Sequence, residues 1–123
     1  MEAITIRGEH LTNLYRYAHE PSYRLMFGEK EGYTAEFAVR HDQILQKILE
    51  SPDQPVKVVV GCDDVCLKTS CPRYNEEKCC AAPELLAKDR RIAESFGVEI
   101  GATYPAQELM QRLNEMAEGK APH

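Results

Sequence analysis

The chain carries VKVVV at residues 56–60 and GCDDVCLKTSCPRYNEEKCCA at residues 61–81, and these two stretches organise the rest of the sequence. The first is a β-branched run that predicts a strand, which Gly61 ends. The second contains every cysteine of the protein, namely Cys62, Cys66, Cys71, Cys79 and Cys80. We therefore expect a strand that leads directly into a cysteine-rich loop.

The flanking sequence predicts short helices and one more strand that hold this loop in place. Apolar residues at helical spacing, prolines and glycines place the element boundaries. They predict a strand at residues 3–7 and helices at residues 10–19, 34–50, 83–96 and from Thr103 onward. The nearly all-Val composition of residues 56–60 suggests either a strand buried on both faces or a strand that pairs with Ile4 to Arg7. The predicted order is β-α-α-β-Cys loop-α-α, a helix-rich mixed α/β fold in one small domain of residues 1–123.

Composition narrows the class of protein. With 123 residues, one domain is the default. A net charge of −5, no Trp and 7% aromatic residues argue against a nucleic-acid-binding surface. No apolar run reaches the roughly 18 residues that span a bilayer, and the first residues carry no secretory signal. We therefore expect a cytoplasmic protein, in which thiols bind metal more often than they form disulfides. The odd number of cysteines points the same way.

The cysteines follow the spacing Cys-x3-Cys-x4-Cys-x7-Cys-Cys, with Pro72 after the third. Thiolates on a loop can bind zinc or an iron–sulfur cluster. Structural zinc sites favour C-x2-C pairs, which are absent here, whereas a C-x4-C spacing occurs among ferredoxin ligands. Adjacent Cys79 and Cys80 point in different directions, so one of them is expected to join Cys62, Cys66 and Cys71. Four thiolates suit a 4Fe–4S cluster, with zinc as the alternative.

Other polar residues have simpler structural explanations. Asp63 and Asp64 can form Asx hydrogen bonds within the turn. Asp89 falls on the apolar side of its helix, and a buried carboxylate needs a partner, for which Arg7 or His10 is the natural candidate. His19 and His41 are predicted to be ordinary helical residues. The sequence contains no nucleophile elbow, phosphate loop or dinucleotide fingerprint, so it gives no basis for assigning an enzyme activity.

The chain resembles a prokaryotic family, domain-of-unknown-function family 1284, whose members are often described as iron–sulfur binding. The resemblance extends over nearly the whole chain. It rests on Arg7-x-x-His10-Leu11, Gly32-Tyr33-Thr34-Ala35-Glu36-Phe37, Val58-x-x-Gly61-Cys62-Asp63-Asp64-Val65-Cys66, Cys71-Pro72, Cys79, and Asp89 followed by Ile92 and Gly97.

The resemblance implies a ligand set that differs from the family pattern. That pattern begins with His-His-Leu-Leu-Cys and continues with Cys-x2-Cys-Pro and a further Cys, which match Cys66, Cys71 and Cys79 here. The early cysteine of the pattern falls at Asn13. The leading hypothesis is that Cys62 replaces it. The competing one completes a three-cysteine cluster with His10, with Asn13 or with an exogenous ligand.

The resulting expectation is a small iron–sulfur protein used for electron transfer or redox sensing, with a protein redox partner. A zinc-stabilised binding module without redox activity is the alternative. Neither the oligomeric state nor the identity of a partner follows from the sequence.

Overall fold

The computed structural model describes residues 2–20, 35–65 and 83–117, with the side chains of residues 35–38 excepted. Its elements confirm the helix-rich mixed α/β fold. In chain order they are β1 (Ile4–Arg7), α1 (Glu9–His19), α3 (Ala35–Glu50), β2 (Pro55–Val59), α4 (Pro83–Ser95), β3 (Thr103–Pro105) and α5 (Ala106–Ala117).

The three strands form one sheet in the order β1-β2-β3. Strands β1 and β2 run parallel, in a register that sets Ile4 opposite Val56 and Arg7 opposite Val59. Of the two alternatives drawn from the Val-rich run, pairing with Ile4 to Arg7 is the one observed. In β2 the side chains of Val56 and Val58 are buried and that of Lys57 is exposed, so only one face of the sheet is fully covered.

The third strand is a correction, since only two strands were expected. Thr103 and Pro105 were expected to open the last helix, but they belong to β3, which pairs antiparallel with β2. The buried Tyr104 between them lies opposite Val56. A strand of three residues that ends in proline carries too few alternating positions to be distinguished from a helix start by sequence.

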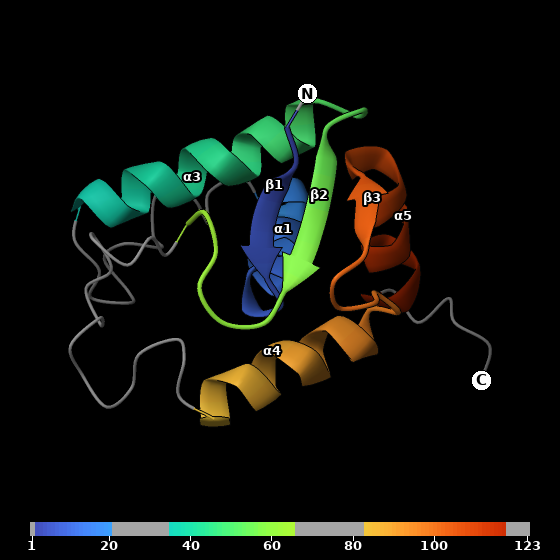
Figure 1. Ribbon diagram of the computed structural model, residues 1–123. Coiled ribbons are helices and arrows are strands. Elements are labelled where there is room, and N and C mark those ends of the chain that lie inside the picture. Colours follow the sequence, from blue (N-terminus) through green and yellow to red (C-terminus); the bar gives the residue numbers. More distant parts are fainter. Residues whose placement is uncertain (1, 21–34, 66–82, 118–123) are drawn as a thin grey trace.

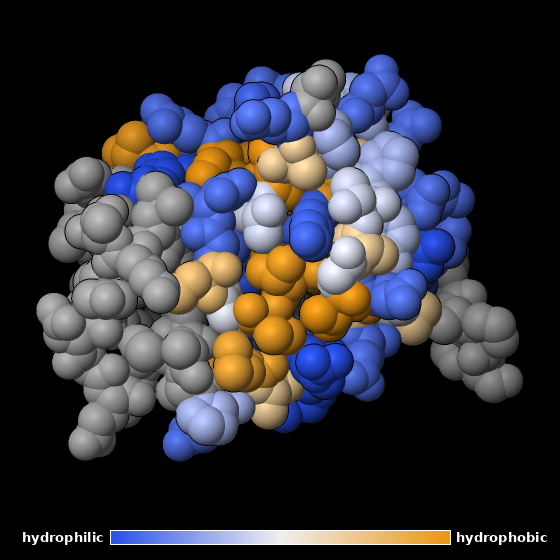
Figure 2. Space-filling view, in the orientation of Figure 1, coloured by the Kyte–Doolittle hydropathy of each residue, from blue (hydrophilic) through white to orange (hydrophobic). Residues whose placement is uncertain are grey.

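Helices cover the sheet unevenly (Figure 1). Helix α1 lies behind the sheet, α3 runs along its upper end, α5 stands beside β3, and α4 crosses below. A single cluster of buried apolar residues joins these elements: Ile6, Leu11, Leu14, Tyr17, Leu45, Ile48, Val56, Val58, Ala93, Val98, Tyr104, Ala106, Leu109 and Leu113. The opposite face is open to the viewer, and Figure 2 shows hydrophobic side chains gathered around the lower end of β2 and above α4.

The carboxyl ends of β1 and β2 meet at the same edge of the sheet because the strands are parallel. There Gly8 N–H donates to the carbonyl of Val59 at 3.1 Å. A Cβ on Gly8 would lie 2.0 Å from the carbonyl oxygen of Asp89, so the absence of a side chain lets α4 approach this junction. Gly61 turns the chain after β2 with a φ of 87°, a value that suits glycine. In parallel sheets, ligands bind beyond this edge.

Candidate metal centre at the carboxyl edge

The carboxylate of Asp63 links three segments at the carboxyl edge of the sheet. Its Oδ2 accepts a hydrogen bond from the backbone N–H of Arg7 at 2.6 Å and lies 2.8 Å from His10 Nδ1. Its Oδ1 accepts from the N–H of Val65 at 3.0 Å, which confirms the Asx hydrogen bond predicted for this turn. One buried carboxylate thus ties the segment after β2 to the end of β1 and to the first turn of α1.

Asp64 binds the same outer edge of β1 as Asp63, two residues nearer the start of the strand. Its Oδ2 accepts from the N–H of Thr5 at 2.8 Å, and its own N–H donates to the carbonyl of Thr5 at 3.0 Å. Asp64 was expected to bond within its own turn, but among the described residues its carboxylate reaches across to the strand instead. The segment that begins with Cys62 is held along the outer edge of β1.

Asp89 approaches the same edge from α4 and is fully buried. Its Oδ1 accepts from the N–H of Glu9, and its Oδ2 accepts from the N–H of Gly61, each at 2.9 Å. Arg7 Nε lies 3.4 Å from Oδ1, so the predicted partnership with Arg7 is confirmed. Burial raises the pKa of Asp89, while the Gly61 hydrogen bond and Arg7 oppose that rise. The carboxylate of Asp89 thus connects α4 both to the start of α1 and to the start of the cysteine loop.

Two further ion pairs surround this junction. Glu9 pairs with the guanidinium of Arg7 and also with Lys88 Nζ, the latter at 3.2 Å. Arg7 is buried, whereas Lys88 is partly exposed, so the charge network extends from the protein interior to its surface.

His10 is buried in the first turn of α1, at 4% exposure. The carboxylate of Asp63 can only accept from it, so the proton of the neutral ring lies on Nδ1 and the lone pair lies on Nε2. Its ring meets that of His41 edge to face, with centroids 5.3 Å apart. Among the described residues, His10 therefore contacts Asp63, at the start of the segment predicted to form the cysteine loop.

His41 is a residue whose importance the sequence analysis missed. It is fully buried on α3, where Asn13 Nδ2 donates to its Nε2 at 3.2 Å and its Nδ1 donates to the Tyr17 hydroxyl at 2.9 Å. That hydroxyl in turn donates to the carboxylate of Asp42. Burial, followed by the proximity of His10, lowers the pKa of His41 to about 3, so the ring is neutral at pH 7. The sequence did contain one indication that His41 is buried, because it lies at helical spacing from Ile44 and Ile48 on the apolar side of the helix.

The predicted ligands are only partly within the described residues. Cys62 is exposed, and it lies between the buried Gly61 and Asp63. Cys66, Cys71, Cys79 and Cys80 fall outside the described residues. The carbonyl of Val65, which precedes Cys66, accepts from Arg40 Nη1 at 3.2 Å. Across residues 2–20, 35–65 and 83–117, no three His, Cys, Asp or Glu side chains are arranged to hold a metal.

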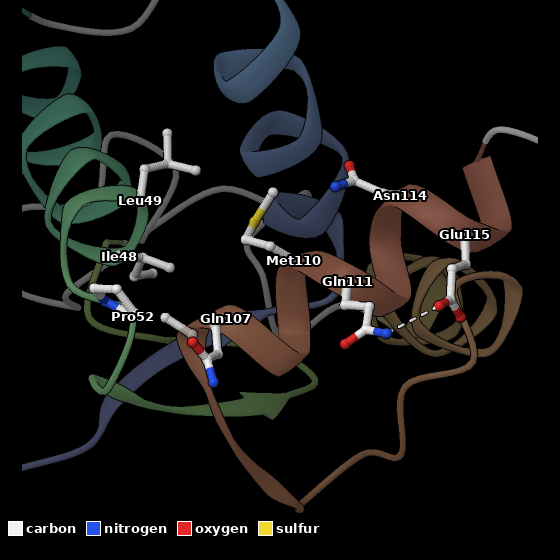
Figure 3. A pocket seen from close by; sticks show the side chains of 9 residues that line it. Ile48, Leu49, Pro52, Gln107, Met110, Gln111, Asn114 and Glu115 are labelled. Atoms are coloured by element: carbon white, nitrogen blue, oxygen red, sulfur yellow. Dashed lines mark hydrogen bonds between the residues drawn. The ribbon is translucent and has the colours of Figure 1, made fainter.

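A hollow of about 410 Å³ lies away from these residues, between the end of α3 and α5 (Figure 3). Ile48, Leu49 and Met110 form its apolar part, and the amides of Gln107 and Gln111 lie on α5 beside it. Gln111 Nε2 donates to Glu115 at 3.2 Å across one helical turn. None of its lining residues bonds to Asp63, His10 or Asp89. In the part of the chain that is described, no helix has the length and apolar character needed to cross a bilayer.

Comparison with known proteins supports the family resemblance. Residues 32–122 match the model of the family described as "Protein of unknown function (DUF1284)". Neither the curated proteins nor the solved structures contain a match. Since the match covers most of the chain, including β2, all five cysteines and Asp89, this protein belongs to the DUF1284 family.

Proposed function

We propose that this protein binds an iron–sulfur cluster at the carboxyl edge of β1 and β2 and uses it for electron transfer or redox sensing. Cys66, Cys71 and Cys79 are the core of the proposed ligand set, and Cys62 is the fourth ligand that the sequence favours. A cluster held there would supply one-electron chemistry. We propose a cytoplasmic location and a protein redox partner.

The observation that carries the proposal is the way Asp63 fixes the start of the cysteine loop. Its three hydrogen bonds join Val65 to β1 and α1. Arg40 holds the carbonyl that precedes Cys66. At the other end of the loop, α4 begins at Pro83 and is bonded through Asp89 to Gly61. Both ends of a segment with four cysteines are therefore anchored to one edge of the sheet, as a multi-thiolate site requires.

The donor set also fits the cluster chemically. Thiolates are soft ligands that select iron–sulfur clusters or zinc over hard cations such as Mg²⁺. The guanidinium groups of Arg7 and Arg40, one beside Asp89 and one on the carbonyl of Val65, offset part of the negative charge that several thiolates would bring. Asp63, His10 and Asp89 are buried, so the inner side of this edge is shielded from water.

The test is anaerobic purification followed by quantification of iron, acid-labile sulfide and zinc. The proposal predicts brown protein with visible absorbance and equal amounts of iron and sulfide. Colourless protein without iron would contradict it. A Cys62→Ser variant tests the fourth ligand, because unchanged iron and sulfide would exclude Cys62 as an essential one.

A zinc-stabilised binding module is the second candidate, and the pairing of Asp64 with Thr5 favours it. The loop is part of the sheet edge, so a metal that closes the loop would stabilise the fold directly. Stoichiometric zinc without sulfide, and unfolding by a chelator, would support this candidate over the cluster.

A further inference from the structure

We infer that the hollow between α3 and α5 binds an extended segment of a partner protein, in which an apolar side chain is followed two residues later by a basic one. This inference goes beyond the proposed function and does not depend on a metal. It assigns binding rather than chemistry to this surface, because the described residues that line the hollow include no buried titratable group.

The apolar part of the hollow can accept one side chain of a ligand. Met110 on α5 lies across from Ile48 and Leu49 at the end of α3 (Figure 3). Met110 and Leu49 are only partly buried, and the flexible thioether of methionine adapts to apolar partners of different shape. The volume of about 410 Å³ falls within the range of about 300–1,000 Å³ that is typical of ligand pockets.

Amide side chains lie along α5 at a spacing that suits a peptide backbone. Gln107 and Gln111 are four residues apart and extend from the same side of the helix (Figure 3). Four residues of an α-helix rise about 6 Å, and an extended chain repeats each of its sides every two residues, or about 6.6 Å. A primary amide has two donors and an acceptor oxygen, which match the C=O and N–H of a peptide group.

These two amides have bonding capacity to offer. Gln107 makes no side-chain hydrogen bond within the part of the chain that is described, and Gln111 uses one N–H for Glu115, which leaves its oxygen as an acceptor. Both residues are exposed. Successive peptide groups on one side of an extended segment can therefore pair with the two amides in turn.

The charges beside the hollow favour a basic ligand. Glu115 is the one charged residue among the described lining residues, and the exposed Glu50 and Asp53 adjoin the lining residues of the α3 side in sequence. From Met110 to Glu115 the helix rises about 7.5 Å, close to the distance of about 6.6 Å between side chains two residues apart on an extended strand. A basic side chain two positions after the apolar one would thus lie beside the carboxylate of Glu115.

Anionic ligands fit this surface less well. The described lining residues include no Lys, Arg or His. The N–H groups of Ala106 and Gln107 at the start of α5 donate to the carbonyls of Gln54 and Pro52, at 2.8 and 3.0 Å. This helix start therefore does not offer those donors to a phosphate or a carboxylate.

The test is a titration of the ¹⁵N-labelled full chain, followed by NMR through the side-chain amide signals of Gln107 and Gln111. The probes are the capped pentapeptides Thr-Leu-Thr-Lys-Thr and Thr-Met-Thr-Lys-Thr, and the same peptides with Glu in place of Lys are the controls. The Lys peptides should shift both amide signals and bind more tightly than the Glu peptides.

Variants at exposed positions separate the contributions. Gln107→Ala removes one pair of hydrogen bonds and should raise the Kd of the Lys peptides about two- to tenfold. Glu115→Gln should abolish the preference for the Lys peptides over the Glu peptides. The matched control is Glu108→Gln, because Glu108 is exposed, pairs with Arg112 and does not line the hollow. It should bind as the natural protein does.

Three outcomes would overturn the inference. They are an absence of shifts in the two amides at millimolar Lys peptide, equal binding of the Lys and Glu peptides, and an unchanged Kd in Gln107→Ala. Shifts that follow the protein concentration instead of the peptide, together with a dimer in sedimentation, would assign the hollow to a second copy of the chain and overturn the peptide as its occupant. None of these results bears on the metal content, so the proposed function stands or falls separately.

Discussion

The two ends of the β1–β2 pair differ in the way their polar groups are used. At the carboxyl edge, Asp63, Asp89 and His10 are buried, and each bonds to elements far away in sequence. At the opposite end lies the hollow of about 410 Å³ between α3 and α5. The amides of Gln107 and Gln111 beside it are exposed, and that of Gln111 bonds to Glu115 on its own helix. Burying a polar group costs free energy, so the end where several are buried together is the better indicator of function than the end with more empty space.

The comparison between the two ends predicts that substitution of Asp89 causes the largest loss in the free energy of unfolding. Asp89→Ala would leave the N–H groups of Glu9 and Gly61 without their acceptor and would remove one of the carboxylates that pair with the buried Arg7. Removing one partner of a buried charged pair costs about 3–5 kcal/mol. Urea unfolding should show this loss. Glu94→Ala, on the exposed side of the same helix, should change stability by less than about 0.5 kcal/mol. A small effect at Asp89 would mean that the carboxyl edge is not held together by its buried charges.

Gly8 tests the close approach of α4 to the same edge. An added Cβ would lie 2.0 Å from a backbone oxygen of Asp89, which cannot rotate away. We expect Gly8→Ala to lower the free energy of unfolding by about 3 kcal/mol, at the upper end of the cost of overpacking. Gly101→Ala is the matched comparison, because it meets no atom within 4 Å but has a φ of +90°. Backbone strain alone should cost it about 1–2 kcal/mol. Equal losses at the two glycines would contradict the steric argument.

His41 makes the stability of the carboxyl edge depend on pH. The pKa of His41 is about 3 in the folded protein and 6.5 as a free side chain. Below pH 6.5, therefore, His41 binds a proton in the unfolded chain but not in the folded one. Its contribution is complete above pH 6.5 and is lost as the pH falls toward 3, at up to about 1.4 kcal/mol per pH unit. Between pH 6.5 and pH 5 this amounts to about 2 kcal/mol.

Urea unfolding at these two pH values, compared with His41→Gln, isolates the effect because glutamine does not titrate. The variant should lose less stability over this interval than the natural protein does. If both lose the same amount, the buried histidine is not the group responsible. His19→Gln, which alters an exposed histidine, should behave like the natural protein.

The smallest change in stability is expected for a substitution at the hollow between α3 and α5. Gln111→Ala removes an exposed amide that bonds to Glu115. It should change stability by less than about 0.5 kcal/mol and leave metal content unchanged. A loss of metal in this variant would reverse the comparison between the two ends.

The sequence predicted the elements whose patterns are long enough to be unambiguous. The apolar run at residues 56–60 and the helical spacing within residues 35–50 carry their own signal, and β1 follows from its β-branched residues. The predicted end of the helix near residue 96 is also found: Gly97 has a φ of +69°, and Val98 N–H bonds back to the carbonyl of Ala93. By contrast, β3 depends on pairing with β2, which no local pattern records.

The candidate site was predictable only in part, for a similar reason. Burial of Asp89 followed from its position among apolar residues, and its partner followed from the need to compensate a buried charge. The contact between Asp63 and His10 joins residues 53 positions apart, and that between Asn13 and His41 joins residues 28 positions apart. Such contacts result from the packing of α1 against β1 and α3. A histidine on an apolar helix face does not reveal which residues it will meet.

The pairing of Asp64 with Thr5 has a consequence for the protein in solution. Strand β1 lies at the edge of the sheet, and its outward N–H groups at Thr5 and Arg7 are taken by the carboxylates of Asp64 and Asp63. An uncovered edge strand is a template on which the strand of another molecule can add, the first step of edge-to-edge aggregation. Two adjacent aspartates therefore protect this small sheet from its own copies, and they do so with the same loop that carries the cysteines.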